Sequence, residues 1–169
     1  MPPERLHAGP NLRGLDGELV LVDVDSRDAA LAAVRDLPAH GAGFGVLLAC
    51  DASAWSVDEV SALVRPALLA GMHWFSAWGP GCERVHDIVD GDVVDLGLDE
   101  PDQGDVPFGG HVMTTWHDDE PLAETLEFFW TCSSPSGDQT DSGLRLVLTV
   151  GLPAAADEVR GAAQRLDDP

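Results

Sequence analysis

The sequence predicts an α/β domain, in which a mainly parallel five-stranded sheet lies between helices in a three-layer sandwich of the flavodoxin-like or Rossmann-like kind. Two observations predict this fold. Five short apolar runs rich in β-branched residues are spread along the chain, and each is followed by a stretch with helical periodicity. Regular alternation of strand and helix favours parallel strands joined by right-handed crossovers.

The five apolar runs are the predicted strands. The first, ELVLVDVD at residues 18–25, is continuous and β-branched, as expected for a strand buried on both faces. The other four lie near residues 44–50, 72–78, 111–116 and 144–150. Periodicity does not define strand order. Numbering the strands along the chain, we favour the order 2-1-3-4-5, with 3-2-1-4-5 as the alternative. We expect one residue of each strand to be largely buried: Val22, Leu47, Phe75, Met113 and Leu148.

Capping residues mark the predicted helices. Ser26 is a suitable N-cap for the first helix, which follows the first strand. Ser56 and Glu59 have the spacing of a capping box, and Gly71 is placed to end the helix that they begin. Three further helices are predicted after Pro80-Gly81, from about residue 118 to 131, and from 154 to 166.

The chain is predicted to hold one domain. Residues 1–17 are expected to be a loose N-terminal lead-in, and residues 18–169 a single α/β domain whose 44% apolar content suffices for a core. The first residues lack the apolar run of a signal peptide, and no stretch approaches the roughly 20 apolar residues of a membrane span. We therefore expect a cytoplasmic protein.

The charge balance is strongly acidic. The chain has 30 Asp and Glu residues against 9 arginines and no lysine, which gives a formal net charge of −21. Nucleic acids and anionic membranes bind through clustered cations, so we exclude both as partners. The acidity is then either an ordinary solvated surface or a field that attracts a basic partner. The three cysteines are far apart and form no C-x-x-C pair, which indicates reduced thiols.

Chemically capable side chains gather in residues 74–87 (WFSAWGPGCERVHD) and again after the fourth predicted strand. In parallel sheets of this kind, ligands bind outside the carboxyl ends of the strands. We therefore expect Trp78, Cys82, Trp116 and His117 to surround one depression at that rim. The ligand-binding candidates are Asp51, Ser76, Trp78, Glu83, His86, Asp87 and Trp116.

Cys82 is the candidate nucleophile. A thiol at a helix N-terminus meets the positive end of the helix dipole, which favours the thiolate. His117 would be its base, and Asp118 or Asp51 would orient the imidazole. The alternative is a structural thiol, because Cys82 shares an apolar helix face with Val85 and others, and a neighbouring glutamate opposes ionisation.

A metal site is a second chemical possibility. Glu83, His86, Asp87 and Asp90 lie on one predicted helix face, and a Glu-x-x-His spacing is half of a two-metal carboxylate motif. No second copy exists, so His117, Asp118 and Asp51 would have to complete the ligand set across the rim. The alternative is a polar, exposed helix face. The sequence identifies no cofactor and no resident metal.

The run Val22-Asp23-Val24-Asp25 resembles the first motif of haloacid-dehalogenase-type phosphatases. That resemblance implies one Asp as nucleophile, the other as acid/base, and Mg²⁺ as cofactor. The chain departs from the pattern, since Ser26 stands where glycine is usual and no lysine is present to steady a phosphate. The alternative is that these strand-end carboxylates cap the following helix.

Two blocks resemble a small family of uncharacterised bacterial proteins. The first is Ser76-Ala77-Trp78-Gly79 with Cys82, Glu83, His86 and Asp87, and the second is Thr114-Thr115-Trp116-His117-Asp118-Asp119-Glu120 with Glu127-Phe128-Phe129. The resemblance extends through Thr149-Val150-Gly151, so it covers roughly residues 70–160. It implies a single bacterial domain. The family has no assigned activity, so the resemblance implies no mechanism.

The sequence thus favours a domain that binds a protein partner or a small ligand at the carboxyl-end rim of the sheet, without catalysis. Acidic charge, rim aromatics and the lack of a complete catalytic set support this reading. The competing class is a small hydrolase that uses either Cys82 with His117 or a metal held by rim carboxylates and histidine. The identity of the partner or ligand is beyond the sequence.

Overall fold

The structure, a computed structural model, describes residues 3–10, 16–37, 43–98, 111–134 and 141–166. These residues form six strands and five helices, which alternate from the second strand onward. The strands are β1 (Glu4–Pro10), β2 (Asp16–Val24), β3 (Gly43–Cys50), β4 (Met72–Trp78), β5 (Met113–His117) and β6 (Asp141–Val150). The helices are α1 (Arg27–Arg35), α2 (Val57–Ala70), α3 (Cys82–Asp95), α4 (Leu122–Cys132) and α5 (Pro153–Arg165).

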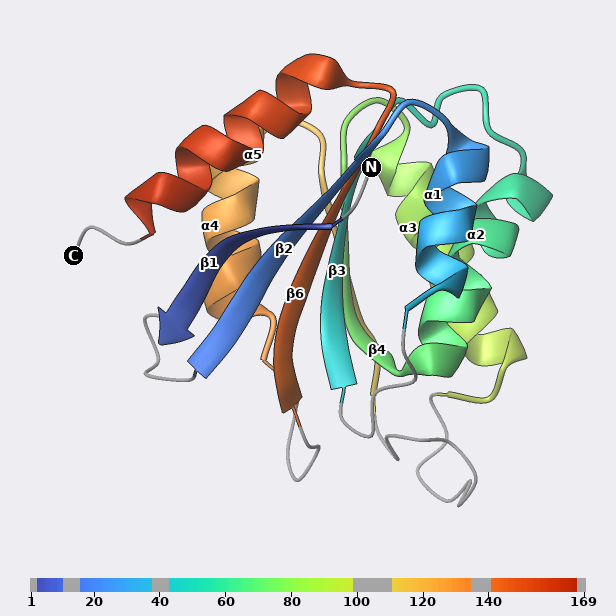
Figure 1. Ribbon diagram of the computed structural model, residues 1–169. Helices are drawn as coiled ribbons and strands as arrows, with labels where there is room; N and C mark the ends of the chain where they lie inside the picture. Colours follow the sequence, from blue (N-terminus) through green and yellow to red (C-terminus); the bar gives the residue numbers. More distant parts are fainter. Residues whose placement is uncertain (1–2, 11–15, 38–42, 99–110, 135–140, 167–169) are drawn as a thin grey trace.

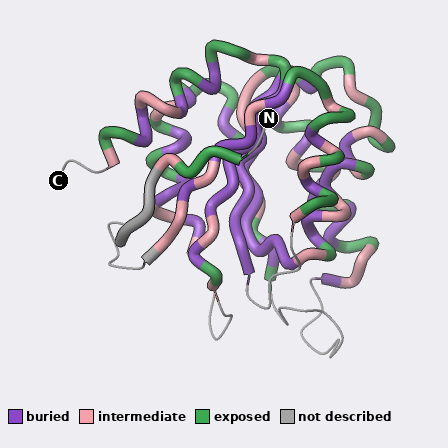
Figure 2. Tube along the Cα trace, viewed as in Figure 1, coloured by how far each residue is buried: buried purple, intermediate pink, exposed green. Residues whose placement is uncertain are grey.

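The strands form one sheet between two helical layers, in the order β1-β2-β6-β3-β4-β5 (Figure 1). Helices α1, α2 and α3 pack on one face and α4 and α5 on the other, and each face has its own apolar core. Figure 2 shows the central strands as the most continuously buried part of the chain. Every residue of β3 is buried. The predicted three-layer α/β sandwich with a mostly parallel sheet is therefore confirmed.

The path of the chain explains why the helices divide as they do. From β2 to β3, β4 and β5 the chain moves in one direction across the sheet, so right-handed crossovers put α1, α2 and α3 on the same face. After the edge strand β5 the chain returns to the middle of the sheet as β6. The direction of the crossover is now reversed, so α4 lies on the opposite face.

The predicted strand order is wrong. Both orders that we considered left the last strand at an edge, but β6 lies between β2 and β3 and pairs with each in parallel. In the structure β6 is buried from Arg145 to Val150, as expected for a strand at the centre of a sheet rather than at its edge. One expected neighbour relation is confirmed, because β4 pairs in parallel with β5.

Two further expectations need correction. Residues 1–17 are not simply a loose lead-in, because β1 pairs antiparallel with β2 and adds a sixth strand at the edge. Its polar residues suit an edge, where Arg160 of α5 bonds to Glu4 at 2.9 Å. Met113, expected in the core, is 37% exposed because β5 is the other edge strand. The expected core positions on the other strands are buried: Val22, Leu47, Phe75 and Leu148.

The helix termini follow the predicted caps. The Ser26 hydroxyl accepts a hydrogen bond from the backbone N–H of Ala29, and Ser56 and Glu59 form both bonds of the capping box. Gly71 ends α2 with φ of 108°, a left-handed conformation that glycine adopts without strain. No helix in the described part of the chain is both long and apolar enough to cross a membrane.

Candidate functional site

The turn Gly79-Pro80-Gly81 holds the start of the candidate site in place. Gly79 has φ of 103°, and a Cβ atom at this residue would lie 2.3 Å from the carbonyl oxygen of Cys50. The backbone N–H of Ala52 donates to the carbonyl of Pro80 at 2.9 Å. Only glycine allows this close approach, so the turn ties the carboxyl end of β4 to that of β3.

The carboxyl ends of β4 and β5 lie side by side. Trp78 is in register with His117, and Ala77 with Trp116. The connection after β4 leads to α3 on one face, whereas the connection after β5 leads to α4 on the other. Neighbouring strands whose connections leave in opposite directions mark a switch point, where ligands of open α/β sheets bind. We call these two strand ends, with the residues that follow them, the β4/β5 rim.

The rim has two sides, because successive strand residues point to opposite faces of a sheet. Trp116 points towards α3, where its ring centroid lies 4.6 Å from that of His86. His117 points towards α4, where its ring lies 5.1 Å from that of Phe128. The structure therefore brings the predicted residues to one end of neighbouring strands, but divides them between two faces rather than placing them around one depression.

On the α3 side, the Trp116 side chain is held in place although it remains exposed. Trp116 is 45% exposed. Its ring contacts the His86 ring, which two carboxylates hold in place. Asp87 Oδ1 lies 3.1 Å from Nδ1 of His86, and Asp90 Oδ2 lies 3.6 Å from Nε2. Asp90 also accepts a hydrogen bond of 2.5 Å from the Thr114 hydroxyl of β5. This side thus presents an ordered indole beside exposed carboxylates.

On the α4 side, a chain of hydrogen bonds runs from the core to the surface. The Trp74 indole N–H donates to Ser76 Oγ at 3.0 Å, and Ser76 Oγ lies 2.8 Å from Thr115 Oγ1. Thr115 Oγ1 lies 3.2 Å from Nε2 of His117, whose Nδ1 lies 2.7 Å from Glu120 Oε2. With a neutral imidazole, each group donates to the next, ending at the Glu120 carboxylate, so all these polar atoms are satisfied.

Our reading of the sequence missed Thr115 and Glu120 as partners of His117. Thr115 precedes His117 by two residues on one strand, so the alternation of β-strand side chains was the available signal. The backbone carbonyl of Glu120 also accepts a 2.8 Å hydrogen bond from the indole of Trp78. His117 and Trp78 therefore contribute to the same side of the rim, where both serve to hold the loop after β5.

Cys82 lies in the core rather than at an open surface. It is 3% exposed, and burial raises the pKa of its thiol, while the backbone N–H of His117 offsets only part of that shift. Both nitrogens of the His117 imidazole are engaged, with Thr115 and Glu120. A nucleophile needs a free base within hydrogen-bond reach, so these contacts favour the structural role of Cys82. Asp118 is exposed beside it.

The remaining candidates do not converge on a single point. Asp51, after β3, accepts a 3.0 Å hydrogen bond from the backbone N–H of Ser53, and the Ser53 hydroxyl and N–H keep the pKa of Asp51 below its usual value. Glu83 is exposed in the first turn of α3. Among the described residues, no group of three or more His, Cys, Asp and Glu side chains is arranged to hold a metal ion.

The strand-end carboxylates after β2 are used within the fold. Asp23 Oδ1 accepts a 2.7 Å hydrogen bond from the Thr149 hydroxyl of the neighbouring strand β6. Ser26, not Asp25, caps α1. The expected alternative, in which these carboxylates cap the following helix, is therefore wrong for α1, and Asp23 instead joins β2 to β6.

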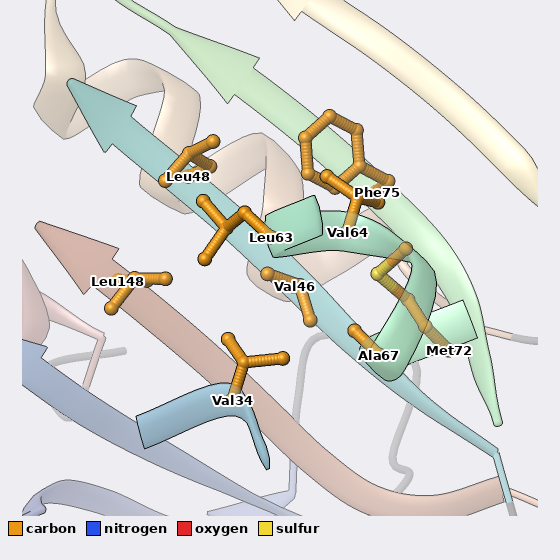
Figure 3. Close-up of a pocket in the computed structure, with 9 residues that line it drawn as sticks. All are labelled: Val34, Val46, Leu48, Leu63, Val64, Ala67, Met72, Phe75 and Leu148. Atoms are coloured by element: carbon orange, nitrogen blue, oxygen red, sulfur yellow. The ribbon is translucent and has the colours of Figure 1, made fainter. Parts of the chain in front are cut away.

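Two hollows lie away from the rim. The first is an apolar void of about 10 Å³ between α1, α2 and the sheet. Figure 3 shows its lining residues, among them Leu63 and Leu148. Its size and lining indicate an imperfection of packing rather than a ligand site. The second is an open groove between α2 and α3, where buried Asp92 accepts hydrogen bonds from Ser61 at 3.1 Å and Arg65 at 2.8 Å.

Comparison with known proteins gives one match. The model of a family described as "Domain of unknown function (DUF7684)" matches residues 26–165, which include both sequence blocks around the rim. No curated protein and no solved structure matches the chain. The match agrees with the expectation of an uncharacterised family.

Proposed function

Because the chain belongs to the DUF7684 family, whose description assigns no activity, we propose a function from the rim itself: the domain binds a cation-bearing protein partner at the β4/β5 rim, without catalysing a reaction. The single observation that carries this proposal is Trp116, a large aromatic side chain that is 45% exposed yet held in place by the ring of His86. An exposed aromatic that is already ordered loses little entropy on binding.

The charges beside Trp116 favour a cationic partner. Asp87 and Asp90 have side chains that are 73% and 52% exposed, and they lie on the helix face that contacts Trp116. Asp118 and Asp119, directly after β5, are exposed as well. An Arg or Lys side chain over an indole gains from cation–π attraction, and nearby carboxylates add to it. The acidic net charge would then speed the encounter with a basic partner.

A protein partner suits this surface better than a small molecule. Trp116 and the carboxylates around it are open to solvent, whereas small-molecule sites bury most of the ligand in a concave pocket. Aromatic residues on an open surface are typical of protein interfaces. The free state of the three cysteines fits the predicted cytoplasmic location.

The alternative, a hydrolase built on Cys82 and His117, has weaker support. The thiol is buried with a raised pKa, and the imidazole is bonded to Thr115 and Glu120 instead of the thiol. A metal-assisted reaction would need ligands that meet at one point. Asp51 and Glu83 instead bond to their own loop or face solvent.

The test is a titration with short synthetic peptides that carry arginine, measured by calorimetry on the wild-type chain and two variants. We expect micromolar binding to the wild type that weakens with salt, since surface charges are screened within about 8 Å at physiological ionic strength. Trp116→Ala should weaken binding at least about tenfold. Leu69→Ala, which removes another exposed apolar side chain on α2, is the matched control and should bind normally.

Both variants should melt within a few degrees of the wild type, because each changes an exposed side chain. Equal binding by Trp116→Ala and the wild type would contradict the proposal. So would a preference for acidic over arginine-bearing peptides.

A further inference from the structure

The outer edge of β5 is unpaired in the part of the chain that the structure describes. β5 is the last strand of the sheet and pairs with β4 on one side only, and no strand among the described residues pairs with its other side. In an edge strand, every second residue directs its N–H and C=O groups away from the sheet. These groups form a template for another extended segment.

The two edges of the sheet differ in how they discourage such pairing. β1, at the opposite edge, has a register shift between Arg5 and His7 and ends at Pro10. Both features discourage the pairing of a further strand with an edge. β5 pairs with β4 in unbroken register from Met113 to His117 and contains no proline, arginine or lysine. The β5 edge therefore lacks the protection that β1 has.

Exposed apolar side chains flank β5 on both faces of the sheet. Trp116 lies on the α3 side. On the α4 side, Phe128 is 37% exposed, and its ring lies 5.1 Å from His117 and 6.2 Å from Trp74. Met113, on β5 itself, is also 37% exposed. A strand laid along β5 would bury alternate side chains against these two sides, as in β-strand addition.

The charge of this region selects among the possible occupants. From β5 to the end of α4, residues 113–132 contain five carboxylates and no arginine or lysine: Asp118, Asp119, Glu120, Glu124 and Glu127. A second copy of the chain would carry the same formal net charge of −21, so edge-to-edge pairing would bring two strongly like-charged molecules together. A segment with arginine or lysine would meet opposite charges instead.

Resting on the proposed function, we infer that the outer edge of β5 binds an extended, arginine- or lysine-bearing segment of the partner, which pairs with β5 as an additional strand. Main-chain hydrogen bonds to the β5 edge supply affinity. The cationic side chains lie against Trp116 and the carboxylates, and supply specificity.

The experiment uses the full chain and a synthetic peptide of about eight residues, the length of an ordinary strand, in which arginine alternates with valine. A second peptide has the same sequence with N-methyl groups on two amides that face β5 in the paired form. A third has glutamate in place of arginine. We measure dissociation constants by calorimetry, and the exchange of backbone amide hydrogens in β5 by NMR.

We expect the N-methylated peptide to bind at least about tenfold more weakly than the unmodified one, because it loses two main-chain hydrogen bonds. The unmodified peptide should slow exchange at the outward-facing amides of β5, and the glutamate peptide should not bind. The Trp116→Ala chain, compared with the Leu69→Ala control, should bind the arginine peptide at least about tenfold more weakly.

The outcomes separate the two proposals. Equal affinity of the methylated and unmodified peptides, without protection of β5 amides, would overturn strand pairing while leaving the rim as a cation-binding surface. Failure of every arginine peptide to bind would overturn both proposals. Self-association of the chain that slows exchange at the outward-facing β5 amides, while the arginine peptide leaves these amides unprotected, would assign the edge to a second copy and would also overturn the inference.

Discussion

Replacing His117 with alanine should destabilise the protein by about 3 kcal/mol, because His117 is a structural part of the rim. The residue is 7% exposed, and its two nitrogens bond to Thr115 and Glu120. Loss of the bond to the carboxylate costs about 1.5 kcal/mol, towards the lower end for charged partners because the Glu120 side chain is 52% exposed. The Thr115 bond contributes about 1 kcal/mol, and lost packing against Phe128 contributes the rest.

The assay is equilibrium unfolding in urea, followed by circular dichroism. We expect the midpoint to fall and the slope to remain that of the wild type, as for a change in stability alone. His86→Ala is the matched control, since both carboxylates that contact this imidazole are exposed and the Trp116 ring that it also contacts is itself 45% exposed. It should cost less than about 1 kcal/mol.

The measurement also decides between two roles for His117. A loss below about 0.5 kcal/mol would refute the structural reading, because a buried and doubly bonded imidazole cannot be that dispensable. If such a variant also lost the ability to bind or to react with a substrate, the imidazole would belong to a functional centre, as the sequence alone suggested.

Three other predictions concern residues outside this network. Burial lowers the pKa of His73 to about 4 in the folded protein, although Asp141 opposes the shift. In the unfolded chain this pKa is about 6.5, so the folded protein loses stability as the pH falls from about 6.5 towards 4. At pH 5 the free energy of unfolding should have fallen by about 2 kcal/mol in urea melts, and His73→Phe should not show this decrease. An equal decrease in the variant would contradict the assignment to His73. At about pH 7.5 the half-buried Cys132 should react with a thiol reagent before Cys82, because burial raises the pKa of the Cys82 thiol. Mass spectrometry would locate the label, and faster labelling of Cys82 would support Cys82 as a nucleophile. Gly79→Ala should lower the free energy of unfolding by at least about 2 kcal/mol in urea melts, since φ is 103° and the new Cβ would meet the backbone of Cys50. At Gly91 in α3 a new Cβ meets nothing within 4 Å, so Gly91→Ala should be neutral or stabilising. Similar effects at the two glycines would contradict the geometry of the turn.

Local signals in the sequence predicted the local structure well. Ser26 and the Ser56/Glu59 pair begin helices as expected, because a cap depends only on residues within one turn. The strands at 72–78 and 144–150 were visible as β-branched runs. Residues 4–10 gave no such signal, because an edge strand such as β1 needs little apolar content.

Strand order could not be predicted because it depends on contacts between distant residues. Nothing near residues 141–150 indicates that β6 inserts between β2 and β3, about 100 residues earlier in the chain. A weaker signal was available for β5. Its polar sequence, MTTWH, is typical of an edge strand, which explains the exposure of Met113 and Trp116.

The candidate site was predicted in location but not in internal arrangement. Trp78 and His117 lie at the carboxyl ends of neighbouring parallel strands, as the fold class requires. The division of Trp116 and His117 between two faces follows from the alternation of side chains along a strand, because the two residues are consecutive in β5. The bond between His117 and Glu120 depends on the path of the loop after β5, which periodicity does not reveal.

The most direct test of the central claim is an unbiased selection of random peptides displayed on phage against the wild-type chain. Selected peptides would then be measured on the wild type, Trp116→Ala and Leu69→Ala. Our account predicts enrichment of sequences in which arginine or lysine alternates with apolar residues, and a loss of binding in Trp116→Ala alone. Enrichment of acidic or uncharged peptides, or binding that Trp116→Ala leaves intact, would contradict the assignment of the β4/β5 rim as a partner-binding surface.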